Sequence, residues 1–560
     1  MIRIEERKAE KLSGLTSIFI SFDYNESIVS WIKQNLDNFI YNKKTKEWEV
    51  TILELTKILD AFCFFDSIYL KLYKENSNNN LIKLNNDDLE FKLPPYPHQL
   101  ETIEYGINHN NWLMLLDMGL GKSMCAIHIA RWLKKYRGLK HCLVVCGINT
   151  LKANWKKEIK IHSDESYKVV GEVTNSKGNI HYSSLQERAK EIREGIKEFF
   201  IIINIESLRS KEIVEAINSR KDIDMIVVDE IHKCSNKQSQ QTDGLLKLKA
   251  NYKIGATGTL IVNSPMSAYT SLKWLGVDNS SLTNFKKQYC IFGGFGGYEI
   301  MGYKNLDILK NEIDYCSLRK IKEEELESLP KKNIIKDYIT LNDEHRIFYN
   351  KIKNGVKDEC LKINLNKNNI LALTTRLRQA TASPSILSTD KIISTKLERC
   401  VDLVEQITYN GNKVVVFSTF KEPVYQLKEL LSNYNPLIGT GDMEDIEVSN
   451  NIDKFQKDES YKVFIGTTSK CGTGITLNAA SYMIMIDTPF TSSATQQAED
   501  RIYRIGTTKP VFIYHLICEG TIDEKVDKII TTKGAMSDYI IDNEINNNTL
   551  DILREYILDI

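Results

Sequence analysis

The sequence predicts an α/β protein with two parallel-sheet lobes, a helical insertion between them and a small α+β domain at the N-terminus. Short apolar runs alternate with helix-length segments from residue 111 onward, as in a parallel sheet covered on both faces. The same rhythm returns after residue 413. A polar, Asn-rich stretch follows residue 75, and 560 residues are too many for one core.

Residues 1–75 are expected to form the small α+β domain, and residues 76–91 a linker. The pattern predicts a strand at 17–24, then a helix that Asn25 caps, then a turn into a second strand within 41–52. The charged start of the chain lacks the apolar core of a signal peptide.

The first lobe is expected over residues 92–275 and the second over residues 396–525. Residues 276–395 between them are helix-rich. The Gly-rich segment 292–297 neither follows a clear strand nor opens a helix, so we expect a mobile loop rather than a phosphate cradle. The predicted strands are 112–118, 141–147, 199–205, 224–230, 252–259, 413–420, 461–468, 482–487 and 511–517.

The composition limits the partners of the chain. Lys plus Arg equals Asp plus Glu, at 74 each, so nucleic acid would have to be met by a local basic stripe. The apolar runs are far shorter than the roughly 18 residues of a membrane helix, so no membrane partner is expected. Eleven scattered cysteines are typical of reduced thiols in a cytoplasmic protein, whether near a nucleoid or in a host cell.

An apolar run breaks into a glycine-containing turn at LLDMGLGKS, residues 115–123. Such a turn presents backbone N–H groups to phosphates at the positive end of a helix. Lys122 would reach the β- and γ-phosphates of ATP, and Ser123 would bind Mg²⁺. Leu116 stands where the full phosphate-loop pattern has its first glycine, which leaves an incidental glycine turn as the alternative. The predicted ATP-binding loop is Met118, Gly119, Leu120, Gly121, Lys122 and Ser123.

A second apolar run, IVVDEIH at 226–232, ends in two adjacent carboxylates. Burying Asp229 and Glu230 together is costly unless a metal ion and a reacting water justify them. Asp229 would hold Mg²⁺, and Glu230 would orient and deprotonate the attacking water. The two segments together predict ATP hydrolysis with ATP and Mg²⁺ as cofactors.

These motifs, together with ATGTLIVNSP (256–265) and QQAEDRIYRIG (496–506), resemble the Swi/Snf-related ATPases of helicase superfamily two. The resemblance covers residues 92–525 and implies two RecA-like lobes and translocation on double-stranded DNA. It implies that Gln99 contacts adenine and that Thr257, Gly258, Thr259, Gly472 and Gly474 couple the lobes. It also implies that the C-terminal residues 526–560 form a brace helix and an acidic tail.

The departures from the family pattern are mild. Gly147 and Leu260 each stand where the family usually has Pro, and Lys320 replaces an Arg in the basic segment 318–325. Residues 204–209 and 373–384 resemble two further family segments.

Arg501 and Arg504 lie three residues apart, which predicts one face of a helix. A solvated basic face is the plain interpretation, but in the resembled family these arginines reach the γ-phosphate as arginine fingers. Hydroxyl-rich strand ends suit DNA phosphates, which position a protein without reading sequence. Ordinary turn chemistry is the alternative there. The DNA-contact candidates of the lobes are Lys152, Asn204, Ser418, Thr467 and Thr468.

The N-terminal region, with its Tyr41–Trp48 segment YNKKTKEW, resembles the HARP-like module of annealing helicases, the HepA-related proteins. That resemblance implies binding of branched DNA. Trp48 would stack on a base, while Lys43 and Lys46 would meet phosphates. The alternative is that Trp48 belongs to the core of the small domain and the lysines are solvated.

The sequence therefore predicts a monomeric ATPase that moves along duplex DNA without reading its sequence, and that remodels branched DNA or displaces bound protein. No strand-separating wedge is visible, so unwinding is not expected. The alternatives are a conventional helicase, the motor of a restriction-type complex, or a DNA-binding scaffold with an idle ATPase site. Protein partners cannot be named from the sequence.

Overall fold

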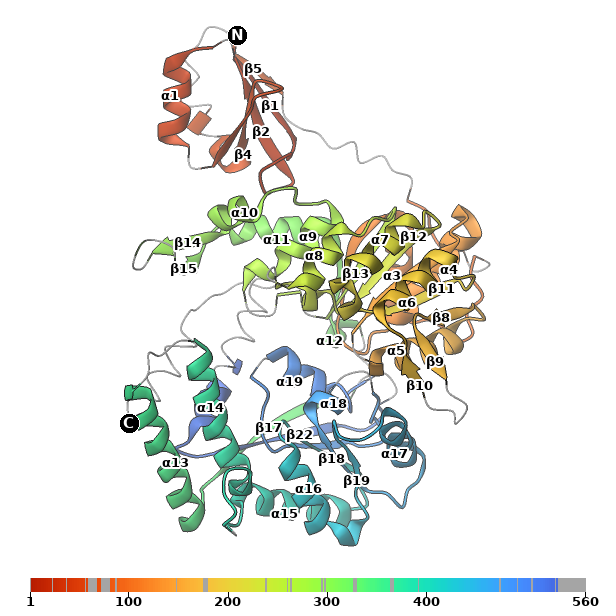
Figure 1. Ribbon diagram of the computed structural model, residues 1–560, viewed down its shortest axis with the longest axis vertical. Coiled ribbons are helices and arrows are strands. Elements are labelled where there is room, and N and C mark those ends of the chain that lie inside the picture. The colour runs from red at the N-terminus through yellow and green to blue at the C-terminus, as the bar shows by residue number, and fades with distance from the viewer. Residues whose placement is uncertain are drawn as a thin grey trace. The chain divides into compact units, whose positions relative to one another are not determined.

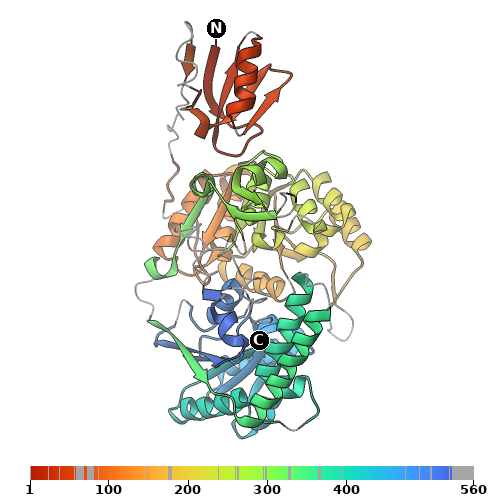
Figure 2. The same ribbon diagram turned by 90° about the vertical axis from the view of Figure 1, so that its left-hand side faces the viewer.

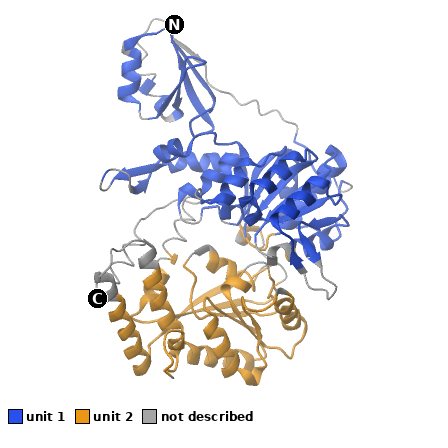
Figure 3. Cartoon of the chain, viewed as in Figure 1, with its two compact units in different colours: residues 1–117, 121–148, 155–320 blue, residues 118–120, 149–154, 321–560 orange. Residues whose placement is uncertain are grey.

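The computed structural model divides into two compact units, which Figure 3 shows in different colours. The first unit holds residues 1–117, 121–148 and 155–320, and the second holds residues 118–120, 149–154 and 321–560. The structure describes residues 2–22, 24–36, 38–55, 57–58, 68–71, 81–85, 88–147, 149–174, 180–236, 239–258, 260–261, 264–293, 296, 299–325, 330–362, 367–390, 392–472, 475–490, 492–504, 507–528 and 530–531. No helix within these ranges is long and apolar enough to cross a membrane.

The first unit begins with a small α+β module, in which a helix lies against a five-stranded sheet (Figures 1 and 2). Helix α1 (Glu26–Asn35) begins after Asn25, whose side-chain oxygen accepts from the N–H of Ile28, as the sequence predicts. Its apolar face packs on the sheet through Ile28 and Ile32. The sheet order is β3 (Phe39–Asn42), β4 (Glu47–Thr51), β2 (Thr16–Ser21), β1 (Ile2–Lys8) and β5 (Ile68–Lys71).

Strand β1 was not predicted from the sequence, because its many charged residues obscure the alternation of apolar and polar side chains that is typical of a strand. Ile2 and Ile4 are buried, whereas the charged residues between and after them stay at the surface or half-buried. The strand pairs antiparallel with β2 and parallel with β5. The burial of Ile2 and Ile4 on one face is therefore enough to stabilise a strand in a segment with many charged residues.

The rest of the first unit is built on a seven-stranded sheet in which all neighbouring strands run parallel. All five strands predicted for the first lobe are present in it. The order is β16 (Ser317–Lys320), β6 (Asn111–Leu116), β13 (Tyr252–Ala256), β12 (Ile223–Asp229), β7 (His141–Cys146), β11 (Phe200–Asn204) and β8 (Tyr167–Val169).

Helices connect these strands, as a parallel sheet requires. Their starts and ends follow local chemistry: the Ser184 hydroxyl accepts from the N–H of Glu187, and Gly138 ends a helix in the left-handed conformation. The connecting helices are α3 (Pro97–Asn108), α4 (Lys122–Arg137), α5 (Asn149–His162), α6 (Leu185–Glu194), α7 (Lys211–Ser219) and α8 (Gln240–Lys247). A two-stranded sheet, β9 (Glu172–Thr174) and β10 (Ile180–Tyr182), lies between α5 and α6 in the chain.

The stretch predicted to be helix-rich, residues 276–395, also supplies strands. It holds β16 of the first sheet and the separate hairpin β14 (Cys290–Gly293) and β15 (Glu299–Tyr303). The prediction of a loop at 292–297 was therefore wrong for Phe292 and Gly293, while residues 294, 295 and 297 lie outside the described part of the chain. The helices of this stretch in the first unit are α10 (Leu282–Tyr289) and α11 (Leu306–Tyr315), which follow α9 (Ala268–Leu275).

The β1–β2 loop of the small module inserts into this region of the first unit. The hydroxyl of Ser13 donates to a carboxylate oxygen of Asp278 at 2.5 Å and lies 3.2 Å from Glu312 and from the hydroxyl of Tyr289. All four side chains are buried. The Glu49 carboxylate accepts backbone N–H groups of the loop and so fixes its shape. The module is thus fastened to the first unit through a buried polar network.

The second unit is built on a six-stranded sheet, again with all neighbouring strands parallel. The four strands predicted for the second lobe are present, and β17 and β19 are additions. The order is β17 (Lys332–Ile339), β22 (Val511–Cys518), β21 (Tyr482–Met485), β18 (Val414–Ser418), β20 (Val463–Thr467) and β19 (Leu437–Gly439). Strand β17 lies at the sheet edge with alternating exposure, which explains its weak apolar signal.

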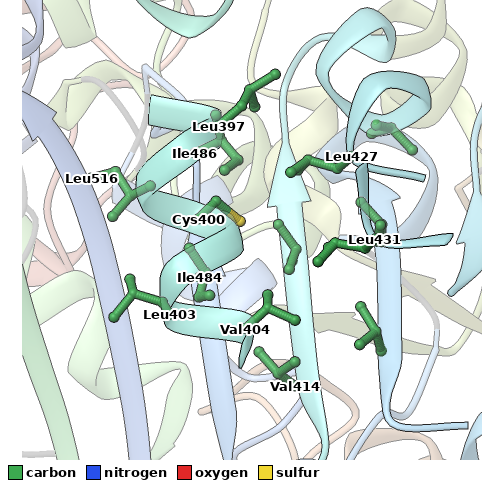
Figure 4. Close-up of a cluster of buried hydrophobic side chains, with 14 of the residues drawn as sticks. Leu397, Cys400, Leu403, Val404, Val414, Leu427, Leu431, Ile484, Ile486 and Leu516 are labelled. Carbon is green, nitrogen blue, oxygen red and sulfur yellow. The ribbon is translucent and has the colours of Figure 1, made fainter. Parts of the chain in front are cut away.

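Two apolar layers cover the faces of this second sheet. On one face, Val404 of α15 (Thr395–Tyr409) lies next to Val414 of β18, as Figure 4 shows, and Leu403 and side chains of α16 (Lys421–Leu430) belong to the same apolar cluster. On the other face, Phe464 of β20 packs against Phe455 of α17 (Asp445–Lys457), with ring centroids 5.7 Å apart. The remaining helices of this unit are α12 (Lys322–Glu325), α13 (Asp343–Lys362), α14 (Lys367–Ala382), α18 (Thr468–Cys471) and α19 (Ser492–Glu499). Residues 532–560, most of the predicted brace helix and tail, lie outside the described residues.

The buried network around Ser13 predicts a pH dependence of stability. Burial and the charge of Asp278 raise the pKa of Glu312 from 4.5 to about 8. The folded protein therefore keeps a proton that the unfolded chain loses near 4.5, so stability should fall as pH rises from 4.5 to about 8. Thermal unfolding at intervals across this window should show the decline in the wild type, and a smaller decline in Glu312→Gln.

The matched control is Asp314→Asn, which removes an exposed carboxylate from the same helix, α11. It should follow the wild-type pH profile. The titratable neighbours of Glu312 are Asp278, Tyr289 and Cys316, and burial raises the pKa of Tyr289 and that of Cys316. An identical pH profile for wild type and Glu312→Gln would contradict the assignment.

Candidate functional site

The phosphate-loop candidate lies between the carboxyl end of β6 and the start of α4. Gly119 and Gly121 both adopt positive φ angles, 86° and 92°, which bend the chain into a tight turn. Lys122 is the first residue of α4, and its ammonium donates to the carbonyl of Leu116 at 3.0 Å. The local backbone is therefore the strand, glycine turn and helix that the sequence predicts for a phosphate site.

Gln99 of α3 lies directly against this turn. A Cβ atom placed on Gly121 would come within 2.4 Å of the Gln99 amide nitrogen, so only glycine fits there. The other end of the Gln99 amide accepts the backbone N–H of Tyr96 at 3.0 Å. This hydrogen bond fixes the orientation of Gln99, with its N–H₂ group toward the loop. The structure thus brings the predicted adenine-contacting residue and the phosphate-loop candidate together.

Asp229 and Glu230 follow at the carboxyl end of β12, two strands along in the same sheet. Both side chains are buried. An Asp229 oxygen accepts the indole N–H of buried Trp155 at 2.9 Å. Glu230 has a φ of 55°, an unusual left-handed conformation for a residue with a side chain. Backbone strain of this kind is concentrated at functional sites.

The two carboxylates have different electrostatic environments. Burial and the charge of Glu230 raise the pKa of Asp229, although Trp155 and Lys122 act against the shift. Burial alone would also raise the pKa of Glu230, but the hydrogen bond to His232 and the nearby cations lower it to about 2. Glu230 is therefore the carboxylate that stays ionised, while burial and the charge of Glu230 favour the protonated form of Asp229.

Thr257 follows the carboxyl end of β13, the strand between β6 and β12. Its hydroxyl lies 2.9 Å from His232 Nδ1 and donates to the Glu230 carboxylate at 3.3 Å. His232 Nδ1 is also 3.2 Å from that carboxylate. Sequence reasoning gave His232 no role, although it stands within the DEIH segment. The structure makes it the link between Glu230 and the predicted coupling residue.

The residues present suit a magnesium ion that is shared with a nucleotide. No three His, Cys, Asp or Glu side chains gather into a metal-binding group among the described residues. Mg²⁺ does not need such a group, because it commonly takes one or two carboxylates and completes its shell with phosphate oxygens and water. Asp229 is a buried carboxylate of this kind, and burial and the charge of Glu230 raise its pKa.

In the second unit, Arg501 and Arg504 lie close together but not on a helix, so this part of the prediction was wrong. Helix α19 ends at Glu499. The Arg501 carbonyl accepts the N–H of Leu477 at 2.9 Å, which turns the chain out of the helix. Both guanidinium groups instead donate to the carbonyl of Ile475, at 3.0 and 3.3 Å. The two arginines are therefore held together by a shared acceptor.

Two buried acids just before the arginines hold this segment in place. Asp500 accepts the ammonium of Lys322 at 2.7 Å, and Glu499 accepts that of Lys332 at 2.6 Å. Burial alone would raise the pKa of Glu499, but His515 and Lys332 lower it to about 2. These pairs could not be predicted from sequence patterns, because the two partners of each pair lie more than 150 residues apart in the chain.

The candidate DNA contacts at strand ends fare differently. Ser418 is 1% exposed and its hydroxyl donates to Asp487 at 2.5 Å, and Thr467 is fully buried. Neither hydroxyl can meet a phosphate in this conformation, because the strand ends are covered. Thr468 is half-buried at the start of α18, and Asn204 is half-buried at the end of β11.

Other predicted residues lie wholly or partly outside the description. Thr259 and Gly474 are outside the described residues, and of Lys152 only the backbone, in α5, is described. Gly258 follows Thr257 after β13. Gly472 lies at the end of α18, where a Cβ atom would come within 2.2 Å of the Thr468 carbonyl oxygen.

In the small module, the prediction that Trp48 stacks on a base was wrong. Trp48 is 6% exposed and belongs to the module's core, where its ring packs against Tyr41 at 4.9 Å. Lys43 and Lys46 are exposed on the turn between β3 and β4, as is Lys44. The turn therefore presents a cluster of lysines, and Tyr41 is the aromatic ring that reaches the surface, at 42% exposure.

Comparison with known proteins identifies the family. Residues 24–386 match the family model of the SNF2-related domain, and residues 395–506 match the helicase conserved C-terminal domain. An uncharacterized ATP-dependent helicase of Mycoplasma genitalium is 26% identical over 516 residues, which cover 89% of this chain and 46% of the relative. The human DNA annealing helicase and endonuclease ZRANB3 is 25% identical over 480 residues, which cover 82% and 41%.

The chain spans less than half the length of these curated relatives. Among solved structures, the SWI2/SNF2 ATPase core of Sulfolobus solfataricus in complex with double-stranded DNA is 23% identical, with a TM-score of 0.38. That match covers 85% of this chain and 99% of the solved chain. The SNF2-related family model matches more than half of the residues of this chain. The chain therefore belongs to the SNF2-related family of ATP-dependent helicases.

Proposed function

We propose that this chain is an ATPase that is stimulated by double-stranded DNA, moves along the duplex and remodels branched DNA or displaces bound protein. The observation that carries the proposal is the convergence of three strand ends. Lys122, Asp229 with Glu230, and Thr257 follow the carboxyl ends of β6, β12 and β13, which are neighbours in one parallel sheet. Ligands bind at this edge in open α/β sheets.

Each residue would have a separate part in ATP hydrolysis. The Lys122 ammonium would leave the Leu116 carbonyl for the β- and γ-phosphates, and Gln99 would contact the adenine. Asp229 and Ser123 would hold Mg²⁺, which neutralises phosphate charge when bound. Glu230, ionised because its pKa is about 2, would orient the water and assist its deprotonation as it attacks the γ-phosphate.

The contacts among Glu230, His232 and Thr257 suggest how hydrolysis is tied to movement. Thr257 lies on the chain segment after β13, and its hydroxyl donates to the water-activating carboxylate. A displacement of that segment would change the hydrogen bonding of Glu230 and hence its position toward the water. We assign Thr257 and His232 as positioning residues for Glu230.

Arg501 and Arg504 are proposed to stabilise the charge that develops on the γ-phosphate during hydrolysis. Both guanidinium groups donate to the carbonyl of Ile475, and that of Arg504 also donates to the hydroxyl of Thr476. A guanidinium can donate two parallel hydrogen bonds to a phosphate. The pairs of Lys322 with Asp500 and of Lys332 with Glu499 would keep the arginine segment in register.

The DNA part of the proposal rests on the family and on the small module. ZRANB3 is named a DNA annealing helicase, and the Sulfolobus core was solved with double-stranded DNA. The exposed turn with Lys43, Lys44 and Lys46 offers a local basic patch in a chain with no net charge. We propose that this turn contacts phosphates near a branch point and that Tyr41, rather than Trp48, is available for a base.

The first prediction concerns hydrolysis. Duplex DNA should stimulate ATP hydrolysis by the wild type, and Lys122→Ala and Glu230→Gln should each lower the stimulated rate by at least about 100-fold. The control is Lys135→Ala, an exposed lysine on the same helix α4, which should stay within about twofold of the wild type. No stimulation of the wild type by any DNA would overturn the proposal.

The second prediction concerns coupling. Thr257→Val keeps the side-chain volume but removes the hydroxyl, so the DNA-stimulated rate should fall about tenfold while the rate without DNA changes by less than about threefold. The control is Thr270→Val, whose buried hydroxyl has no partner among the described residues. Equal loss of both rates in Thr257→Val would show a role in hydrolysis alone.

The third prediction concerns the module. Lys43→Ala combined with Lys44→Ala should weaken binding to forked DNA and reduce the slope of log affinity against log salt by roughly 2, because two phosphate contacts are lost. Lys33→Ala, an exposed lysine on α1, serves as the control. An unchanged slope would mean that the turn does not touch DNA.

The same preparations separate the alternatives. Release of a strand from a tailed duplex would indicate a conventional helicase, and co-purification with a nuclease would indicate a restriction-type motor. Fork binding that is unaltered in Glu230→Gln would indicate a DNA-binding scaffold whose ATPase is idle.

A further inference from the structure

The β14–β15 hairpin of the first unit is a separate two-stranded sheet that extends beyond α10 and α11 (Figure 1). Four large apolar side chains among the described residues of the hairpin are exposed to solvent. Ile291, Phe292, Ile300 and Met301 are 40–58% exposed. An isolated two-stranded hairpin is marginally stable in water, and exposed apolar clusters usually mark a binding surface.

The base of the hairpin is firmly held. The Cys290 thiol is buried and contacts the sulfur of Met266 at 3.4 Å. The N–H of Lys304 donates to the carbonyl of Tyr289 at 3.0 Å, and Asn305 donates to the carbonyl of Gln288 at 2.9 Å. The hairpin is thus fixed to α10 at its base, and its exposed apolar side chains lie beyond this base.

The exposed apolar side chains of the hairpin have a defined arrangement. Phe292 and Ile300 are direct partners across the two strands, so their side chains share one face. A Cβ atom on Gly293 would come within 2.8 Å of the Met301 side chain, which shows that Met301 lies over this glycine. The register shifts between Ile291 and Phe292, and such a bulge re-aims side chains.

Three lysines lie at the base of the hairpin. Lys287 and Lys304 are exposed, and Lys286 is half-buried. Burial raises the pKa of the Cys290 thiol, while Lys286 and Lys304 are near enough to lower it. Exposed apolar side chains with lysines at the base of the same hairpin are complementary to duplex DNA, in which stacked bases lie between two phosphate backbones.

We infer that the β14–β15 hairpin is a DNA wedge, whose Phe292 and Ile300 pair inserts at a base step of the duplex while Lys287 and Lys304 contact the flanking phosphates. Phe, Ile and Met are the side chains that proteins use to unstack a base step from the groove. The inference deepens the proposed function and depends on it for the presence of DNA. A wedge would let a translocating motor distort the duplex locally without separating the strands.

The test is base unstacking, measured without ATP. A duplex that carries 2-aminopurine should gain fluorescence at least about twofold when the wild type binds, since unstacking relieves quenching. Phe292→Ser with Ile300→Ser should lose this gain, and Phe292→Leu should retain it. The matched control is Ile446→Ser, at an isoleucine on α17 of the second unit that is 66% exposed, and it should behave as the wild type.

Duplex-stimulated ATP hydrolysis keeps this inference separate from the proposed function. The double variant should keep its rate of ATP hydrolysis without DNA within about twofold, which shows that it is folded. If the wild type binds and is stimulated by duplex without any gain in fluorescence, or if the double variant gains as much as the wild type, the wedge is overturned. A wild type that shows neither stimulation nor DNA binding overturns both proposals.

Discussion

The burial of two adjacent carboxylates at the end of β12 is the constraint on which the rest of the first unit depends. Asp229 and Glu230 repel each other in a medium of low dielectric constant, and neither could stay charged there unaided. In the folded protein, the two carboxylates have different hydrogen-bond partners. Trp155 donates to Asp229, while His232 and Thr257 contact Glu230. Glu230 is thereby kept ionised, whereas burial and the charge of Glu230 raise the pKa of Asp229.

The same constraint explains the order of the strands. Thr257 can reach Glu230 only because β13 lies next to β12, and Lys122 can influence both carboxylates only because β6 follows next in the sheet. The second unit handles charge in another way. Its buried acids, Asp500 and Glu499, are neutralised by Lys322 of α12 and by Lys332 of β17. Buried pairs of this kind hold position more than they add stability.

Helix α10 supports two features that both bear on DNA. Gln288 and Tyr289 contact Ser13 of the small module, and the same residues accept the backbone and side-chain hydrogen bonds that anchor the β14–β15 hairpin. The lysine turn of the module and the apolar hairpin therefore belong to one continuous part of the first unit. A force on either would be carried into α10 through buried contacts, because close-packed interiors transmit strain.

The two parallel sheets, the phosphate loop and the acidic pair could be predicted from the amino-acid sequence, because each depends on a contiguous run of residues. The nine predicted apolar runs form nine strands, and the glycines before Lys122 form the turn. The burial and the partners of single side chains, in contrast, depend on the packing of the folded chain. Trp48 and Ser418 looked like surface contacts but are buried, since local sequence does not reveal which face another element covers. The partners of Glu499, Asp500 and Ser13, and the exposure of the β14–β15 hairpin, depend on residues far away in the chain. Periodicity is a local property and survives in the sequence, whereas long-range pairing and burial exist only once the chain has packed.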